Sequence, residues 1–185
     1  TYMSGIVGQS DNVHLGGYPG PLRRLAGVWV EEIDALAPEQ FNQVVMDSGE
    51  SCKCGLVCEL MHLEGAESLG TYGEDFYKGM PAVTRNSFGK GHVYYVGTRM
   101  EEAGLDSILD KAAAEAEVES IVSGGEGLEI VCRKTKEGKQ LYFVMNFGEQ
   151  ERALPACFAG HKDLITGQKM EGTALKKYDV CIIEG

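Results

Sequence analysis

Residues 69–98 read LGTYGEDFYKGMPAVTRNSFGKGHVYYVGT and carry the densest structural signals in this chain of 185 residues. A loop rich in acids and aromatics, Tyr72 to Tyr77, leads into a β-prone run from Ala82 to Arg85. A turn over residues 86–91 separates this run from a second one, His92 to Val96. The stretch therefore predicts a hairpin that is preceded by a loop of defined shape.

The loop from Tyr72 to Tyr77 is the first candidate for recognition. Exposed aromatic faces pack against apolar C–H groups, while neighbouring carboxylates accept hydrogen bonds from hydroxyl groups. Arg85 is expected to brace the loop by pairing with Glu74 or Asp75. The alternative is an ordinary surface hairpin whose aromatic side chains only pack.

Composition bounds the class of protein. The formal net charge is −11, and the Lys and Arg residues are scattered. Such a surface repels phosphates, so we expect no nucleic-acid partner. The apolar runs are far shorter than the roughly 20 residues that cross a bilayer, so we expect no membrane span. Six cysteines, three of them on one predicted strand, argue against a disulfide framework and for a reducing, cytoplasmic setting.

The chain opens on Thr1 to Gly5, which has the character of a strand that ends in a loop. A domain does not normally begin in mid-strand, so we expect further residues of the native protein upstream of Thr1. The loop that follows contains HLGGYPGP, residues 14–21. Two glycines followed by two prolines specify backbone shape rather than periodic structure. We expect this segment, like the loop at residues 72–77, to form a contact surface.

Strands and two helices are predicted before residue 118. A short helix opens at Pro21 and stops at Gly27. The clearest helix runs from Arg99 to about Glu117, with a capping box between Thr98 and Glu101. The further strands are Val28–Ile33, Gly55–Leu63 and Glu67–Tyr72, with a connection over Ala37–Phe41.

Past residue 118 the pattern changes. The segment from Ser123 to Gly127 reads SGGEG and is expected to act as a linker. Short β-prone runs separated by turns follow it, which predicts a small antiparallel sandwich or barrel. These runs are Leu128–Arg133, Gln140–Phe147, Arg152–Phe158, Asp163–Ile165 and Asp179–Glu184. We therefore divide the chain into domains 1–118 and 119–185.

Cys52, Cys54 and Cys58 have the close spacing of a soft-metal site. On an extended strand, however, they would be spread over roughly 20 Å. Zinc needs ligands that converge on a tetrahedron, so structural cysteines are the favoured interpretation. No metal ligand, cofactor site or catalytic histidine arrangement is predicted.

Paired acids invite a glycosidase interpretation, because retaining glycosidases use two carboxylates about 5 Å apart. The pair at residues 31–32 faces opposite ways on a strand, and the pair at residues 101–102 opens a helix, where acids are favourable without catalysis. Glu74 and Asp75 remain, and a turn-stabilising or interface role is favoured for them. No catalytic residue is predicted.

Two long phrases carry a resemblance to a known family. They are HLGGYPGPLRRLAGVWVEEIDAL, residues 14–36, and HLEGAESLGTYGEDFYKGMPAVTRNSFGKGHVYYVGTRMEE, residues 62–102. The tail adds LYFVMNFGEQE, DLITGQ and YDVCIIE. Over essentially its whole length the chain resembles the β-galactosidases of glycoside hydrolase family 42.

The resemblance implies a (β/α) barrel that carries two catalytic glutamates, an α/β trimerisation domain and a small β domain, in that order. This chain would begin partway into the second of these. The implied fold class is α/β, a partial flavodoxin-like or amidotransferase-like α/β domain followed by a small antiparallel β-sandwich. The thiols that bind zinc in some members belong to the barrel, so no cysteine here inherits a ligand role.

The expected function is that of the non-catalytic C-terminal portion of a cytoplasmic, homotrimeric β-galactosidase. Its partners would be the barrel domain and further copies, and the parent would act on β-galactosides. The chain would hold subunits together and shape the substrate cleft. A carbohydrate-binding module and an amidotransferase-like domain stay open as alternatives. The candidate contact or cleft-lining residues are His14, Gly16, Gly17, Tyr18, Pro19, Tyr72, Glu74, Asp75, Phe76, Tyr77 and Arg85.

Overall fold

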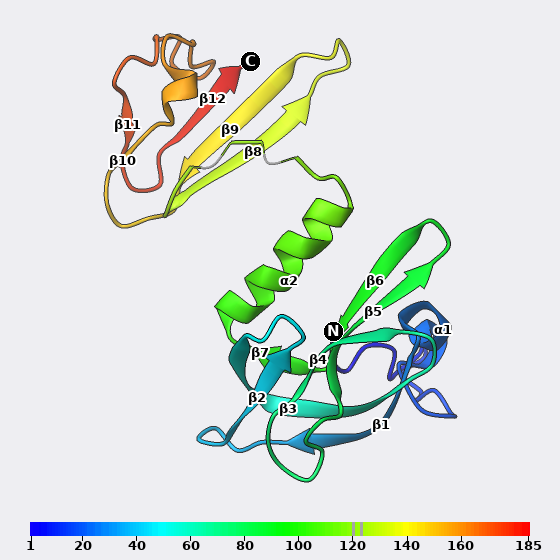
Figure 1. The fold of residues 1–185 in the computed structure, drawn as a ribbon. Helices are drawn as coiled ribbons and strands as arrows, with labels where there is room; N and C mark the ends of the chain where they lie inside the picture. The colour runs from blue at the N-terminus through cyan, green and yellow to red at the C-terminus, as the bar shows by residue number, and fades with distance from the viewer. Residues whose placement is uncertain (120, 123) are drawn as a thin grey trace. The chain divides into compact units, whose positions relative to one another are not determined.

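The computed structural model describes residues 1–119, 121–122 and 124–185. They form two compact units, Thr1–Val118 and Glu119–Gly185, and each is described by itself (Figure 1). Ser123, the first residue of the predicted linker, lies outside the described residues.

Antiparallel strands dominate the first unit. Its short helical elements are a 3₁₀ turn, η1 (Gly20–Leu22), and α1 (Arg23–Ala26), and one longer helix, α2 (Glu102–Glu115), follows the last strand. The strands are β1 (Val28–Ala35), β2 (Phe41–Met46), β3 (Ser51–Leu63), β4 (Glu67–Tyr72), β5 (Pro81–Phe88), β6 (Gly91–Val96) and β7 (Thr98–Met100).

The long strand β3 organises this unit. Its first half pairs with β2, its second half pairs with β1, and its middle pairs with β7. The path of pairings runs from β3 through β2, β4 and β5 to β6, and β7 then returns to β3 after the single residue Gly97. The sheet therefore closes on itself through the chain connection from β6 to β7.

A core of apolar side chains packs together in this closed sheet. Cys52 and Cys54 are buried while their neighbours Ser51 and Lys53 are exposed, as the alternation of a strand requires. Helix α2 adds Ile108 to the same core, and Arg85 on β5 holds the end of the helix through Glu115, with Nε and Oε2 3.0 Å apart.

The expected flavodoxin-like α/β architecture is wrong for this unit. A parallel sheet needs long crossover connections, usually helices, between its strands. Every strand pairing in the unit is antiparallel, and its described helices are α1, with 4 residues, and α2, with 14. Tight turns such as the one between β5 and β6 explain the difference, because they join neighbouring antiparallel strands directly.

Three local predictions also need correction. Thr1–Gly5 forms turns rather than a strand. The turn expected over residues 86–91 is shorter, since β5 continues to Phe88 and β6 begins at Gly91. The capping box is absent, because Thr98 lies in β7 and Glu101 is the N-cap of α2 without a side-chain cap bond. The Glu101 carboxylate instead accepts a hydrogen bond from Lys53 N at 3.0 Å.

The second unit is also built of antiparallel strands. A three-stranded sheet has the order β12-β9-β8, and β10 pairs with β11. The elements are β8 (Leu128–Lys134), β9 (Gln140–Asn146), β10 (Arg152–Ala153), a 3₁₀ turn η2 (Ala156–Phe158), β11 (Ala174–Leu175) and β12 (Val180–Glu184). The strand expected over Arg152–Phe158 is therefore only two residues long. Pro155 ends it, because proline lacks the backbone N–H that a ladder needs.

Two buried polar side chains order the second unit. Asp163 accepts hydrogen bonds from the backbone N–H groups of Ile165, Thr166 and Ile182. Asn146 donates to the carbonyls of Gln150 and Leu175. Each joins segments that are distant in sequence. None of the helices in the described residues is long and apolar enough to cross a membrane.

Candidate functional site

The first candidate segment, residues 14–19, is fixed on β1. Tyr18 pairs with Val30, whose N–H donates to the Tyr18 carbonyl at 2.8 Å. Gly17 has φ of 85°, and a Cβ there would lie 2.2 Å from Trp29 Nε1. Only glycine fits so close to the indole. The two-glycine signal in the sequence therefore reflects a real backbone constraint.

The side chains of this segment divide into inward and outward groups. Pro19 is buried, and Tyr18 packs against the core formed by Val28 and Val30. Leu15, by contrast, is 96% exposed. Arg23 holds the segment from outside, because its Nη1 donates to the Gly16 carbonyl at 3.0 Å. The segment is thus anchored from within and presents an apolar side chain to solvent.

The second candidate segment, residues 72–77, also has a buried base. The Tyr72 hydroxyl donates to the carbonyls of Glu59 and Gly97, at 3.2 and 3.0 Å. The Tyr77 hydroxyl donates to Asp34 Oδ2 at 2.7 Å. Both tyrosines are 1% exposed, so the expectation of exposed aromatics is wrong for them.

Phe76 is the outward-facing aromatic of the second segment. Its ring meets the ring of Tyr77 edge to face at 4.9 Å, and the side chain is 74% exposed. Because Tyr77 is itself packed against Tyr72 at 5.0 Å, the position of Phe76 is set by the core beneath it.

The two acids of the second segment already have partners. Glu74 Oε1 accepts from Gln43 Nε2 at 2.8 Å, and Asn42 contacts both the N–H and the carbonyl of Glu74 at 3.1 Å. Asp75 Oδ1 accepts from Phe76 N at 2.6 Å within its own turn. Both carboxylates serve the shape of the loop.

The predicted brace between Arg85 and this loop is wrong. Arg85 Nη1 pairs with Glu67 at 2.7 Å, and Arg85 Nε pairs with Glu115 at 3.0 Å. The pairings between β4 and β5 place Arg85 opposite Glu67, at the far end of these strands from the loop. The braces that sequence reasoning missed are Asn42 and Asp34.

Trp29 and His62 form a surface cluster beside the first segment. Their rings stack with centroids 4.8 Å apart, and His62 Nε2 lies 2.6 Å from Glu31 Oε2. The Arg23 guanidinium lies 5.5 Å from the Trp29 ring centroid. The indole is thus engaged by protein groups.

Glu59 is a buried carboxyl group below the first segment. It is 0% exposed, and it accepts hydrogen bonds from Met3 N at 2.6 Å and from the Tyr95 hydroxyl at 2.9 Å. Burial raises the pKa of Glu59, although these two hydrogen bonds oppose the shift. Burial, followed by the charge of Glu59, also raises the pKa of Tyr18 to about 12. A lone acid within the apolar run CELMHL was the available sequence signal.

The raised pKa of Glu59 makes folding depend on pH. The folded protein binds a proton at a pH where the unfolded chain, with an ordinary value of 4.5, has released it. This contribution to stability is complete below the unfolded pKa and is lost as pH rises through the folded pKa. We expect Glu59→Gln to gain stability relative to the wild type as pH rises, measured by urea unfolding between about pH 4 and 8.

Glu115→Gln is the matched control. Hydrogen bonding from Tyr94, opposed by burial and reinforced by Arg85, lowers the pKa of Glu115, so its contribution has the opposite sign and is lost as pH falls. A stability difference between Glu59→Gln and wild type that stays constant with pH would contradict the assignment.

The cysteines of the 52–58 run are buried in the core of the first unit. Across residues 1–119, 121–122 and 124–185, no three His, Cys, Asp or Glu side chains converge as a metal site would require. All three thiols pack in the core of the first unit.

Comparisons with known proteins cover both units. Residues 1–119 match the model of the β-galactosidase trimerisation domain, and residues 127–185 match that of the β-galactosidase C-terminal domain. The chain is 48% identical over 183 residues to β-galactosidase LacA of Lactobacillus acidophilus, covering 99% of this chain and 27% of the relative. It is 39% identical to β-galactosidase BgaP of Planococcus sp., covering 94% and 26%.

Solved structures agree with these matches. The β-galactosidase of Bacillus circulans sp. alkalophilus superposes with a TM-score of 0.86 at 38% identity, covering 99% of this chain and 28% of that one. The chain thus spans about a quarter of the length of the relatives it matches. It belongs to the β-galactosidases of glycoside hydrolase family 42, of which it comprises the non-catalytic trimerisation and C-terminal domains.

Proposed function

We propose that this chain holds subunits together in a β-galactosidase whose hydrolytic chemistry resides in a separate barrel domain. The observation that carries the proposal is the presentation of Leu15 and Phe76. They are the two most exposed large apolar side chains of the first unit, at 96% and 74%. A single exposed apolar residue is ordinary, but each of these lies on a loop that is fixed from within. A side chain held in place loses little entropy on binding, which suits it to anchor an interface.

Two observations support the activity proposed for the parent: the names of the relatives, and the hydrogen bonds that already engage the two loop acids of this chain. The relatives are named β-galactosidases, and the matched model is named for trimerisation, which supports three copies of the parent. Glu74 and Asp75 are committed to the shape of their loop. We therefore assign retaining hydrolysis of terminal β-galactosides to two barrel carboxylates. The proposed parent is cytoplasmic, and the charge of −11 supports no role with nucleic acid.

The carbohydrate-binding alternative is less favoured by the same geometry. Sugar recognition by stacking needs an open aromatic face. Tyr72 and Tyr77 are buried and Trp29 is engaged by His62 and Arg23, which leaves Phe76, without a second open aromatic in either segment beside it. The amidotransferase-like alternative rested on a flavodoxin-like fold, which the antiparallel first unit does not have.

The proposal is tested in the complete β-galactosidase that carries this chain. Replacing Leu15 and Phe76 together with aspartate should raise the dissociation constant of the trimer at least about 100-fold, because each anchor is worth more than about 1.4 kcal/mol. Sedimentation velocity at graded concentrations measures the change. Both side chains point to solvent, so the far-ultraviolet circular dichroism of the subunit should be unchanged.

Phe88→Asp is the matched control. Phe88 is 42% exposed at the turn between β5 and β6, outside both candidate segments. Its variant should sediment as the wild type does. A double variant that stays trimeric, or a control that dissociates equally, would show that the two loops do not hold the subunits together.

A further inference from the structure

The run CKCGLVC, residues 52–58, is not a regular strand. The pairing of β3 with β7 sets Cys54 opposite Met100 and Cys58 opposite Thr98, with a register shift between Gly55 and Cys58. Four steps along β3 therefore correspond to two steps along β7. Leu56, inside the irregularity, has φ of 66°, which is left-handed backbone. The extra residues bulge away from the ladder, as in a β-bulge.

The bulge brings two cysteines together that the sequence alone separates. Two residues along a regular strand are about 6.6 Å apart, whereas four residues span about 13 Å. A disulfide joins Cα atoms up to about 6.8 Å apart. Cys54 and Cys58 thus occupy positions within bonding reach, while the uniform spread expected for an extended run would have kept them apart.

The side chains of Cys54 and Cys58 are buried in the same core. Cys54 is 2% exposed and Cys58 is 0% exposed, and both belong to the core of the first unit. The Sγ of Cys58 lies 3.7 Å from Thr98 Oγ1. Cys52 differs, because its Sγ donates to the Val44 carbonyl at 3.8 Å.

The pKa values of the two thiols are shifted in opposite directions. A hydrogen bond from the Cys54 thiol lowers the pKa of Cys58 against the effect of burial, and the hydroxyls of Thr98 and Tyr77 reinforce this. The same interaction, followed by burial, raises the pKa of Cys54. Since the thiolate is the nucleophile, Cys58 is the attacking member of the pair and Cys54 the resolving one.

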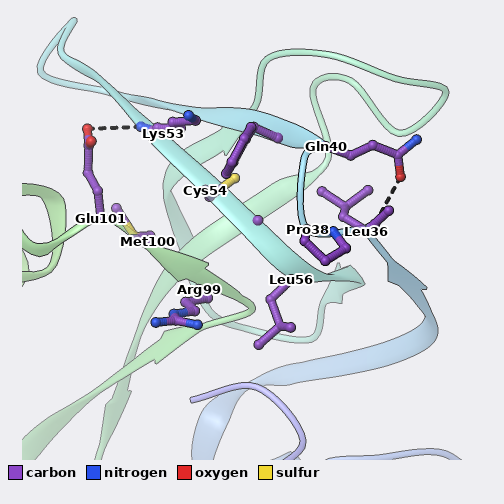
Figure 2. A pocket seen from close by; sticks show the side chains of 12 residues that line it. Leu36, Pro38, Gln40, Lys53, Cys54, Leu56, Arg99, Met100 and Glu101 are labelled. Carbon is purple, nitrogen blue, oxygen red and sulfur yellow. Dashed lines mark hydrogen bonds between the residues drawn. The ribbon is translucent and has the colours of Figure 1, made fainter.

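A groove at the surface is lined in part by Cys54. It has a volume of about 450 Å³ and is lined by residues of β3, β7 and the connection after β1, among them Leu36, Leu56 and Cys54 (Figure 2). In Figure 2 Cys54 lies on β3 between Lys53 and Leu56. Cys54 is thus the member of the pair next to the groove, and oxidation of Cys58, which is 0% exposed, requires a small peroxide to pass Cys54.

We propose that Cys54 and Cys58 form a redox-active dithiol, which a small hydroperoxide converts into a disulfide within β3. The Cys58 thiolate attacks one peroxide oxygen, the O–O bond breaks, and Cys58 becomes a sulfenic acid as hydroxide leaves and takes up a proton. The Cys54 sulfur then displaces the sulfenic hydroxyl, which leaves as water with the Cys54 proton. Two thiols are oxidised, one peroxide is reduced, and two waters form. A small dithiol reductant reverses the reaction.

The chain offers a direct assay. Trypsin cleaves after Lys53 and after Lys78, so residues 54–78 form one peptide with Cys54 and Cys58 as its two cysteines. Residues 25–53 form a reference peptide whose cysteine is Cys52. The intact protein is treated with hydrogen peroxide, denatured, alkylated and digested. Mass spectrometry then counts the alkyl groups on each peptide.

The expected result is loss of both alkyl groups from peptide 54–78, without oxygen uptake on either cysteine, while Cys52 keeps its label. Dithiothreitol before alkylation should restore both groups. Cys58→Ser should slow oxidation of Cys54 at least about tenfold, because the favoured thiolate is gone. Cys52→Ser should leave the reaction unchanged.

Two results would overturn the proposal in the wild type, without reliance on any variant. Peptide 54–78 could keep both labels at a peroxide dose that oxidises the exposed Cys157. It could also lose alkyl groups while a cysteine gains oxygen that dithiothreitol does not remove, which would mark unpaired oxidation; fragment ions distinguish this from sulfoxide on Met61.

Discussion

Asp163→Ala is expected to cost the second unit a large share of its stability. The Asp163 carboxylate is 3% exposed and accepts hydrogen bonds from Ile165 N, Thr166 N and Ile182 N at 3.1, 3.0 and 3.0 Å, and from the Thr166 hydroxyl at 2.6 Å. Alanine leaves these donors without their acceptor in a buried site. A loss of about 3 kcal/mol or more follows, a large share of the stability of so small a unit.

Urea unfolding monitored by circular dichroism measures the loss. Asp179→Ala is the control, because Asp179 accepts one side-chain hydrogen bond, from Lys176 N at 3.1 Å, in an exposed turn. It should cost about 1 kcal/mol. Equal effects of the two variants would show that Asp163 does not hold the unit together.

The same carboxylate makes the unit sensitive to acid. Burial alone would raise the pKa of Asp163, but the hydrogen bonds from Thr166, Ile182 and Ile165 outweigh it, and the pKa is lowered. The contribution of Asp163 is therefore present above its unfolded pKa and is lost as pH falls through the folded value. Asp163→Ala should accordingly weaken the dependence of stability on pH in the acid range.

Gly27→Ala should destabilise the first unit by about 3 kcal/mol. Gly27 ends α1 with φ of 66°, and a Cβ there would lie 2.6 Å from Asn86 Cγ and 2.9 Å from Ala66 N. Asn86 cannot withdraw freely, because its Nδ2 donates to the Leu25 carbonyl at 2.8 Å. The Gly27 carbonyl also accepts from Glu64 N and Ala66 N, so a shift of its backbone disturbs the entry to β4.

Gly89→Ala separates the steric part of this effect from the conformational part. Gly89 has φ of 62°, and a Cβ there would meet no atom within 4 Å. The control therefore carries only the left-handed backbone cost of about 1 kcal/mol. Thermal unfolding of the two variants in parallel measures the difference. Equal melting temperatures would show that the contacts around Gly27 relax at no cost.

Sequence periodicity identified the elements whose burial follows a simple rule. Glu67–Tyr72 was predicted with the bounds that β4 has, and a helix was predicted where α2 lies, although Ile108 is the buried residue of α2 while Leu105 and Leu109 are exposed. Strand β2 was missed because its pattern is inverted. Asn42 is buried, since it holds the backbone of Glu74, while Phe41 is 50% exposed. Asn42 is a polar residue that is buried because it bonds a distant loop, so a rule that places only apolar residues inside does not find this strand.

The candidate segments show the same limit. Glycine and proline marked the shape of residues 14–21 correctly, because a backbone constraint is local. The burial of Tyr72 and Tyr77 could not be inferred, because their partners Glu59, Gly97 and Asp34 are set by the fold. Tyrosine suits both a surface and a core, and tertiary contacts decide between them.

The pairing of Tyr18 with Val30 has a consequence for how copies of this chain can meet. A strand with unpaired backbone groups is a template on which another chain can extend the sheet. Here the segment that carries Leu15 occupies part of the free edge of β1, since Val30 N already donates to Tyr18 O. At Val30, contact with another copy must therefore proceed through side chains rather than through a sheet that continues between subunits. The loop that presents Leu15 to solvent therefore also blocks the addition of a strand from another chain at this part of β1.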